Sequence, residues 1–106
     1  MEFTREQKIQ MYKEKQNFVK ELSGVIPFYI PNVVGLQYKV FENKKEGLFD
    51  EYLVIGFVGG ARLARCCNIN SNMVILSEIA KYVKGGYYDE VEDLVKLEND
   101  PDWVEI

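Results

Sequence analysis

Glu51–Ile69, with the sequence EYLVIGFVGGARLARCCNI, is the stretch that decides the predicted fold. It holds the densest apolar run of the chain. Near its middle lies the pair Gly59-Gly60, and glycine readily adopts the positive φ angles that a tight hairpin turn needs. We therefore expect two antiparallel strands at the centre of a small sheet, with the rest of the chain covering this hairpin.

The strand that precedes the glycine pair, Glu51–Val58, is apolar on both of its faces, which is typical of a strand covered from two sides. One face carries Leu53, Ile55 and Phe57, and the other carries Tyr52, Val54 and Val58. Upstream, Leu36–Asn43 alternates between apolar and mixed positions, the period-two pattern of a half-buried strand. Downstream, Ala61–Ile69 has two mixed faces, so its register is less well defined by the sequence.

The N-terminal segment predicts a helix that begins at a capping box. Thr4 and Gln7 have the spacing at which each side chain can bond the other residue's backbone N–H. Apolar residues then recur on one side of a helical wheel, and Ser23-Gly24 ends the pattern. This apolar stripe consists of Ile9, Met11, Tyr12, Phe18, Val19 and Leu22. We expect it to cover the sheet.

The segment Val25–Val34 is apolar but contains Pro27 and Pro31, which have no backbone N–H to donate to a sheet. It is expected to be an extended edge segment or a covering loop, and not a central strand. The residues between the prolines, Phe28–Ile30, have two interpretations. They cap one end of the core, or they form a presented hydrophobic binding patch.

Two helices are expected after the sheet. Asn70–Asn72 supplies N-cap candidates for a helix over Met73–Val83, and Gly85-Gly86 closes it. A second, shorter helix is expected over Tyr87–Leu97, with Tyr88, Val91, Leu94 and Val95 on its apolar side. Pro101 stops this helix, and the apolar residues Trp103, Val104 and Ile106 indicate that the tail docks on the body.

Together these elements predict one α+β domain over residues 1–106. It has an antiparallel sheet of three to four strands, with an N-terminal helix and two C-terminal helices packed on it. The first 23 residues are charged and amphipathic and lack the apolar core of a signal peptide. No apolar run is long enough to cross a membrane, so a cytoplasmic setting without membrane contact is expected.

The composition excludes several chemistries. The chain has no histidine, which removes Ser-His-Asp and Cys-His nucleophilic systems and histidine-ligated zinc. Its two cysteines, Cys66 and Cys67, are adjacent and cannot build a structural zinc site or a disulfide framework. Either could serve as a lone reactive thiol, although a buried cysteine in a strand is the commoner case. We expect no catalytic residue, cofactor or metal site.

The charge is unevenly distributed along the chain. From Tyr87 onward there are eight acidic residues against Lys96 alone, whereas the preceding part carries a slight excess of basic residues. The acidic end is either a solvated helix face or a negative surface that meets a basic partner. For the second interpretation the candidate contact residues are Asp89, Glu90, Glu92 and Asp93, with Phe28 and Tyr29 as apolar contacts.

These observations favour a non-catalytic protein-interaction module. In size, acidity and order of elements the chain is similar to small phage and mobile-element inhibitors, including some anti-CRISPR proteins, although no motif matches a particular family. This similarity implies carboxylates that occupy the basic nucleic-acid groove of a target protein, without direct binding of nucleic acid.

Two other classes of function are kept. The first is a structural homo-oligomer joined through Phe41 or through Phe28–Ile30. The second is an enzyme subunit that uses Cys66 or Cys67, or a small-molecule pocket between helix and sheet.

Overall fold

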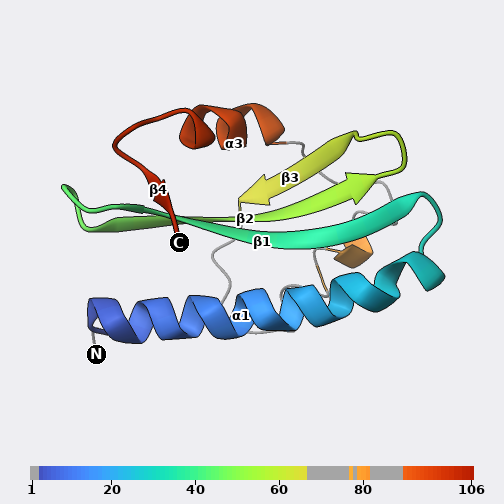
Figure 1. Ribbon diagram of the computed structural model, residues 1–106, viewed down its shortest axis with the longest axis horizontal. Helices are drawn as coiled ribbons and strands as arrows, with labels where there is room; N and C mark the ends of the chain where they lie inside the picture. The colour runs from blue at the N-terminus through green and yellow to red at the C-terminus, as the bar shows by residue number, and fades with distance from the viewer. Residues whose placement is uncertain (1–2, 67–76, 78, 82–89) are drawn as a thin grey trace.

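The computed structural model describes residues 3–66, 77, 79–81 and 90–106. Its elements, in chain order, are α1 (Arg5–Val25), the 3-10 helix η1 (Ile26–Phe28), β1 (Val33–Asn43), β2 (Leu48–Phe57), β3 (Arg62–Cys66), α3 (Val91–Glu98) and β4 (Val104–Glu105). The predicted α+β architecture is confirmed, with an N-terminal helix, a four-stranded antiparallel sheet and short C-terminal helical segments (Figure 1).

The strand order in the sheet is β3-β2-β1-β4. The prediction that both strands of the glycine hairpin are central was therefore wrong for one of them: β2 is central, whereas β3 is at an edge among the described strands. The reason is the long β1–β2 hairpin, whose register runs from Val33↔Phe57 to Asn43↔Leu48 and occupies the second side of β2. On the far side of β1, β4 adds a short fourth strand.

The strand boundaries differ from the predicted ones at the N-terminal ends. β1 begins at Val33 and not at Leu36, and an irregularity in its pairing between Val33 and Gly35 interrupts the apolar alternation there. The tight turn at Gly59-Gly60 is confirmed, because both residues have positive φ angles, of 92° and 88°.

Helices cover both faces of the sheet, with α1 below it and α3 above it in Figure 1. The core on the α1 side contains Leu53 and Ile55 from β2, and the core on the α3 side contains Tyr52 and Val54. The prediction that this strand is covered twice is thus confirmed. Leu53, 1% exposed, is among the most deeply buried side chains of the described chain.

The capping box of α1 forms as expected. The Thr4 hydroxyl accepts from the backbone N–H of Gln7 at 3.2 Å, and the Gln7 side chain accepts from the backbone N–H of Thr4 at 2.9 Å. The first residue of the helix, Arg5, donates two hydrogen bonds to the buried carboxylate of Glu42 on β1, at 2.5 and 2.8 Å. This pair fixes the start of the helix to the sheet and holds the pKa of Glu42 below its usual range.

The C-terminal part follows the prediction with two corrections. The last helix begins at Val91, after Glu90 as its N-cap, and it buries Leu94 and Leu97, whereas Val95 is exposed. The tail docks as expected. Val104–Glu105 pairs with β1, and the backbone N–H of Ile106 donates to the carbonyl of Val40 at 3.0 Å.

Most of the predicted helix over Met73–Val83 lies outside the described residues. Within it, Ser77, Ile79, Ala80 and Lys81 are helical. Ile79 is buried in the core on the α1 side, which agrees with the expectation that this segment packs on the sheet. None of the described helices is long and apolar enough to span a membrane.

Candidate functional site

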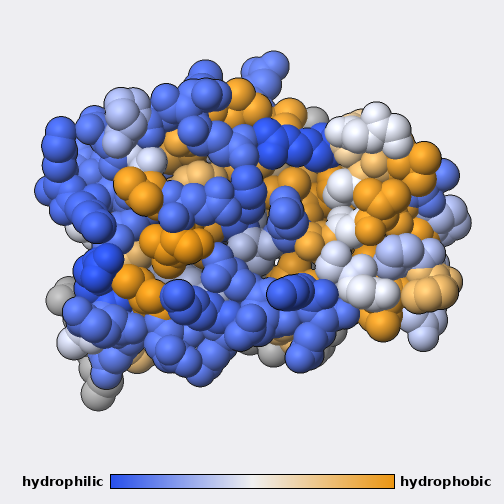
Figure 2. Space-filling model, in the orientation of Figure 1, coloured by the Kyte–Doolittle hydropathy of each residue, from blue (hydrophilic) through white to orange (hydrophobic). Residues whose placement is uncertain are grey.

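An exposed apolar surface lies at the end of the molecule that holds η1 and the β2–β3 turn. Figure 2 shows hydrophobic side chains gathered at this end. Its most exposed members are Phe28, at 85%, and Tyr29, at 79%. We call this surface the aromatic end and define it by its exposed large hydrophobic residues: Val25, Phe28, Tyr29, Val34 and Val58.

The turn that carries the two aromatic residues is anchored to the core by its neighbouring residues. Ile26 is buried, Ile30 packs against the same core, and the carbonyl of Ile26 accepts from the backbone N–H groups of Tyr29 and Ile30, both at 3.0 Å. Of the residues Phe28–Ile30, Ile30 packs on the core, as the first interpretation expects. Phe28 and Tyr29 are exposed instead. Both rings therefore project from a hydrogen-bonded turn.

A backbone hydrogen bond joins the β2–β3 turn to the loop before β1 at this end of the molecule. The backbone N–H of Val58 donates to the carbonyl of Asn32 at 3.0 Å, which ties the β2–β3 turn to the loop before β1. Asn32 has a φ of 69°, a left-handed conformation that asparagine tolerates better than most residues. Val34 and Val58 thereby extend the apolar surface beyond the two aromatic residues, and sequence analysis did not assign either of them to a site.

The two segments that form the aromatic end contain no charged residue. No charged residue occurs between Glu21 and Lys39, or between Glu51 and Arg62. The fold brings these two charge-free segments together, because the first runs through η1 into β1 and the second runs through β2 into the Gly59-Gly60 turn (Figure 1). The uncharged surface therefore results from two separate stretches of sequence.

A groove of about 650 Å³ lies next to this end. We call it the sheet groove. It lies between α1 and the sheet. Its lining includes the small or apolar residues Val34, Gly35, Val54, Gly56 and Ala61, the polar residues Ser23 and Gln37, and the charged residues Lys20, Lys39, Arg62 and Glu105. Gly35 and Gly56 are paired across the strands. A Cβ atom built on Gly56 would lie 3.6 and 3.8 Å from Val34 and Gly35, which are ordinary contact distances, whereas one built on Gly35 would lie only 2.9 Å from the hydroxyl of Ser23.

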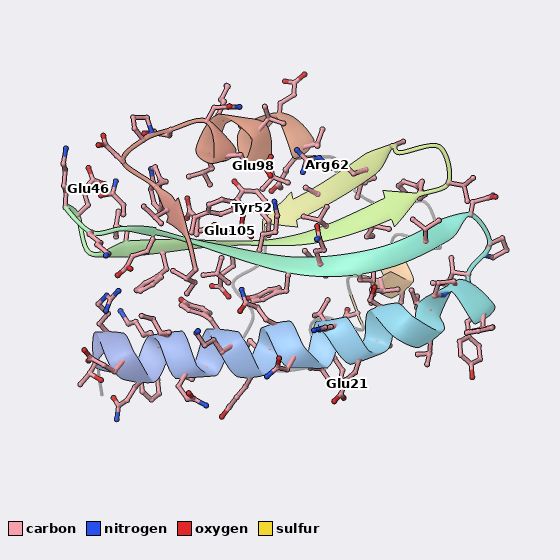
Figure 3. The ribbon with its side chains drawn as sticks, viewed as in Figure 1. Glu21, Glu46, Tyr52, Arg62, Glu98 and Glu105 are labelled. Carbon is pink, nitrogen blue, oxygen red and sulfur yellow. The ribbon has the colours of Figure 1, made fainter. Side chains whose placement is uncertain are left out.

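Charged residues of the groove lining tie α3 to the sheet. The Glu98 carboxylate of α3 accepts from Arg62 of β3 at 2.6 Å and from Lys39 of β1 at 2.6 Å (Figure 3). Lys39 also lies 3.5 Å from the Glu105 carboxylate of β4. The Arg62 hydrogen bond is the main cause that lowers the pKa of Glu98 to about 2, with a further contribution from Lys39. These contacts fix the C-terminal end of α3.

The acidic end is therefore only partly available to a partner. Glu98 and Glu105 are ion-paired to the body, and Asp102 lies 3.1 Å from Lys45. Of the four predicted contact carboxylates, Glu92 and Asp93 are exposed on α3, and Glu90 is the N-cap, where its backbone N–H donates to the carbonyl of Ala64 at 2.8 Å. Asp89 lies outside the described residues.

A buried polar cluster lies between α1 and the sheet. The Tyr38 hydroxyl donates to the carboxylate of Glu51, and Lys15, 8% exposed, is buried on the same side of α1 as Tyr12. Burial, with smaller contributions from the nearby Glu51 and Asp50 carboxylates, raises the pKa of Tyr12 to about 12. The Tyr12 phenol is therefore protonated at neutral pH.

The alternative interpretations of the sequence named Cys66, Cys67 and Phe41. The side chain of Cys66 and the whole of Cys67 lie outside what the structure describes. Within the described residues, no three carboxylate or thiol groups converge in a way that could hold a metal ion. Phe41 is 2% exposed and packs under α3, so the prediction of an interface through Phe41 was wrong.

No protein-family model matches this chain, and no curated protein or solved structure is significantly similar to it. Any function assigned to the chain therefore rests on its own residues and their arrangement.

Proposed function

We propose that this protein is a non-catalytic protein-interaction domain and that the aromatic end is its binding surface. The observation that carries the proposal is the exposure of Phe28 and Tyr29, 85% and 79%, on a turn whose neighbours Ile26 and Ile30 are anchored in the core. A soluble domain gains no folding stability from two aromatic rings in water, whereas a binding surface gains most of its affinity from such residues.

The way the rings are held favours binding further. Aromatic side chains have only two rotatable angles, and their turn is fixed by hydrogen bonds and flanked by Pro27 and Pro31. Little conformational freedom is therefore lost when the rings become buried in a partner. Val25, Val34 and Val58 surround the rings with additional apolar area.

The test is a capture experiment with matched variants. We expect the double variant Phe28→Ser/Tyr29→Ser to lose the polypeptide that the wild-type protein binds. Leu48→Ser is the control, because Leu48 is also apolar and 51% exposed but lies at the β1–β2 turn, at the opposite end of the molecule (Figure 1). A captured polypeptide counts only if it binds again when purified. Equal binding by all three proteins would refute the proposal.

A second candidate function has one specific observation in its favour. Glu92 and Asp93 are exposed on α3, whereas three other acids of this end, Glu98, Asp102 and Glu105, are ion-paired within the chain. Exposed carboxylates on a compact scaffold could occupy a basic groove that normally holds phosphates, which is the action proposed for an anti-CRISPR-like inhibitor. The opposing argument is that acids in the first turn of a helix also stabilise the helix dipole.

Neutral substitutions separate these two roles. We expect Glu92→Gln/Asp93→Asn to lose a basic, nucleic-acid-binding partner, and added DNA to displace that partner from the wild type. Glu21→Gln/Glu46→Gln makes the same change in net charge at two exposed carboxylates away from α3 (Figure 3). If both variants weaken capture equally, net charge alone is responsible and the α3 surface is not a site.

A further inference from the structure

We propose that this protein forms a two-fold symmetric dimer in which Phe28 and Tyr29 of each copy insert into the sheet groove of the other. This inference rests on the proposed function, because it names the partner of the aromatic end as a second copy of the chain. A two-fold interface requires a surface that is complementary to itself. One end of this molecule has both parts, a pair of projecting rings and a groove.

The groove is suited to an aromatic side chain. Its floor holds Gly56, and a glycine within a strand often marks a place where another group approaches the backbone closely. The cross-strand partner of Gly56, Gly35, is already approached by the Ser23 hydroxyl of its own chain. Val34, Val54 and Ala61 add apolar contacts. The chain's own rings do not fill this space, because Phe28 and Tyr29 are almost fully exposed.

Charge favours a second copy over an unrelated protein. In a two-fold interface each residue near the axis approaches its own equivalent, so a charged residue would meet a like charge. The aromatic end is formed from two segments without any charged residue, which avoids this repulsion at the rings. Of the charged residues that line the groove, Lys39, Arg62 and Glu105 are ion-paired within the chain, whereas Lys20 is exposed. Away from this end the chain carries a net charge of −4, which would oppose self-association through most other surfaces.

The area is sufficient for a stable dimer. A buried aromatic side chain removes about 150–250 Å² from water. Four inserted rings, two from each copy, would contribute on the order of 600–1,000 Å², and the groove walls that cover them would contribute a similar area. The total reaches the range of about 1,200–2,000 Å² that is typical of specific interfaces.

The groove also offers a partner for the phenol. A tyrosine hydroxyl that becomes buried needs a hydrogen bond. Among the groove residues, the exposed side-chain amide of Gln37 can donate to or accept from the hydroxyl of Tyr29 of the other copy. We therefore assign Phe28 as the apolar anchor and Tyr29 as the residue that sets the register of the interface.

Sedimentation velocity over a range of concentrations tests the dimer. The first variant, Phe28→Ala/Tyr29→Ala, removes the rings. The second, Gly56→Val, fills the groove; it should fold, because Gly56 has room for a Cβ atom and valine is favoured in strands. Leu48→Ala is the control. We expect the wild type and the control to dimerise, and each of the other two variants to lose affinity by at least about tenfold.

Mixing the two defective variants gives the sharpest result. The ring-deficient copy keeps an intact groove and the filled copy keeps intact rings, so a mixed dimer restores one of the two contacts. We expect heterodimers whose affinity is weaker than that of the wild-type dimer but stronger than that of either variant's homodimer, because one of the two contacts is restored. A monomeric wild type at ~100 μM, a dimeric ring-deficient variant, or a mixture without heterodimers would each overturn the inference.

The failure of this inference can be told from the failure of the proposed function. If the wild type is monomeric but captures a different polypeptide through Phe28 and Tyr29, the aromatic end is a binding surface for another partner and only the dimer is refuted. If the wild type neither dimerises nor loses a partner on Phe28→Ser/Tyr29→Ser, both are refuted. A small molecule bound in the sheet groove of a monomer, detected by mass spectrometry of the native protein, would likewise refute the dimer.

Discussion

Ile26 and Phe28 lie two residues apart on one turn of 3-10 helix, yet Ile26 is 7% exposed and Phe28 is 85% exposed. The buried residue fixes the turn to the core on the α1 side, and the exposed one carries its ring into solvent. Within a single turn, Ile26 therefore contributes to folding, whereas Phe28 is available to the proposed partner. This division makes the two roles independently testable.

The first prediction concerns this division. We expect Ile26→Ala to lower the free energy of unfolding by about 2–5 kcal/mol, because it truncates a buried side chain. Phe28→Ala should change the unfolding free energy by less than about 0.5 kcal/mol, since its ring is exposed. Urea unfolding at a concentration where the protein is monomeric measures both. Equal losses would show that the Phe28 ring is part of the core.

The second prediction concerns the central strand. Leu53 and Ile55 on β2 are 1% and 2% exposed and belong to the core on the α1 side. Replacing either by alanine should cost about 2–5 kcal/mol of unfolding free energy. Val58→Ala, at an exposed position just beyond the same strand, is the control. A neutral result at both buried positions would contradict the central placement of β2.

The third prediction concerns pH. The pKa of Glu98 is about 2 in the folded protein, below its ordinary value of 4.5, because Arg62 and Lys39 donate to the carboxylate. Between these two pH values the unfolded chain binds more protons at this site, so stability falls as the pH drops from about 4.5 toward 2. Because this group is partly exposed, we expect its protonation to lower the free energy of unfolding by about 1–2 kcal/mol.

The variant Glu98→Gln should lose that part of the acid sensitivity. Glu92→Gln, at an exposed carboxylate on the same helix, should keep it. Unfolding midpoints measured between pH 2 and pH 7 compare the three proteins. Parallel pH profiles for the wild type and Glu98→Gln would mean that the ion pairs do not contribute to stability.

The fourth prediction concerns the capping box. Thr4→Ala removes the hydroxyl that accepts from the backbone N–H of Gln7 and should cost about 1 kcal/mol. Thr4→Ser keeps the acceptor and should retain most of the stability. Thermal unfolding followed by circular dichroism distinguishes the two variants, and an identical loss in both would point to the methyl group of Thr4 and not to its hydroxyl.

The local features of the fold were predictable from the sequence. The capping box at Thr4, the glycine turn at Gly59-Gly60 and the two-sided burial of β2 each depend on residues close together in the chain, and all three are confirmed. The position of β3 at an edge was not predictable, because it depends on which side of β2 the long β1 strand occupies.

The candidate site was predictable only in part. Phe28 and Tyr29 stood out because two prolines flank them, but the sequence left open whether they face the core or solvent. Val34, Val58 and the sheet groove had no sequence signal, since they come together only after β1, β2 and the loop before them have folded. The pairing of Glu98 with Lys39 likewise joins residues far apart in the chain.

The most direct test of the central claim is site-specific photo-crosslinking in the cells that make this protein. A p-benzoylphenylalanine residue at position 28 should form a crosslink to another polypeptide, a second copy or a different protein, that mass spectrometry can identify. The same residue at position 48, exposed at the opposite end of the molecule, should form none. If position 28 gives no crosslink, or both positions give the same ones, the aromatic end is not a binding surface.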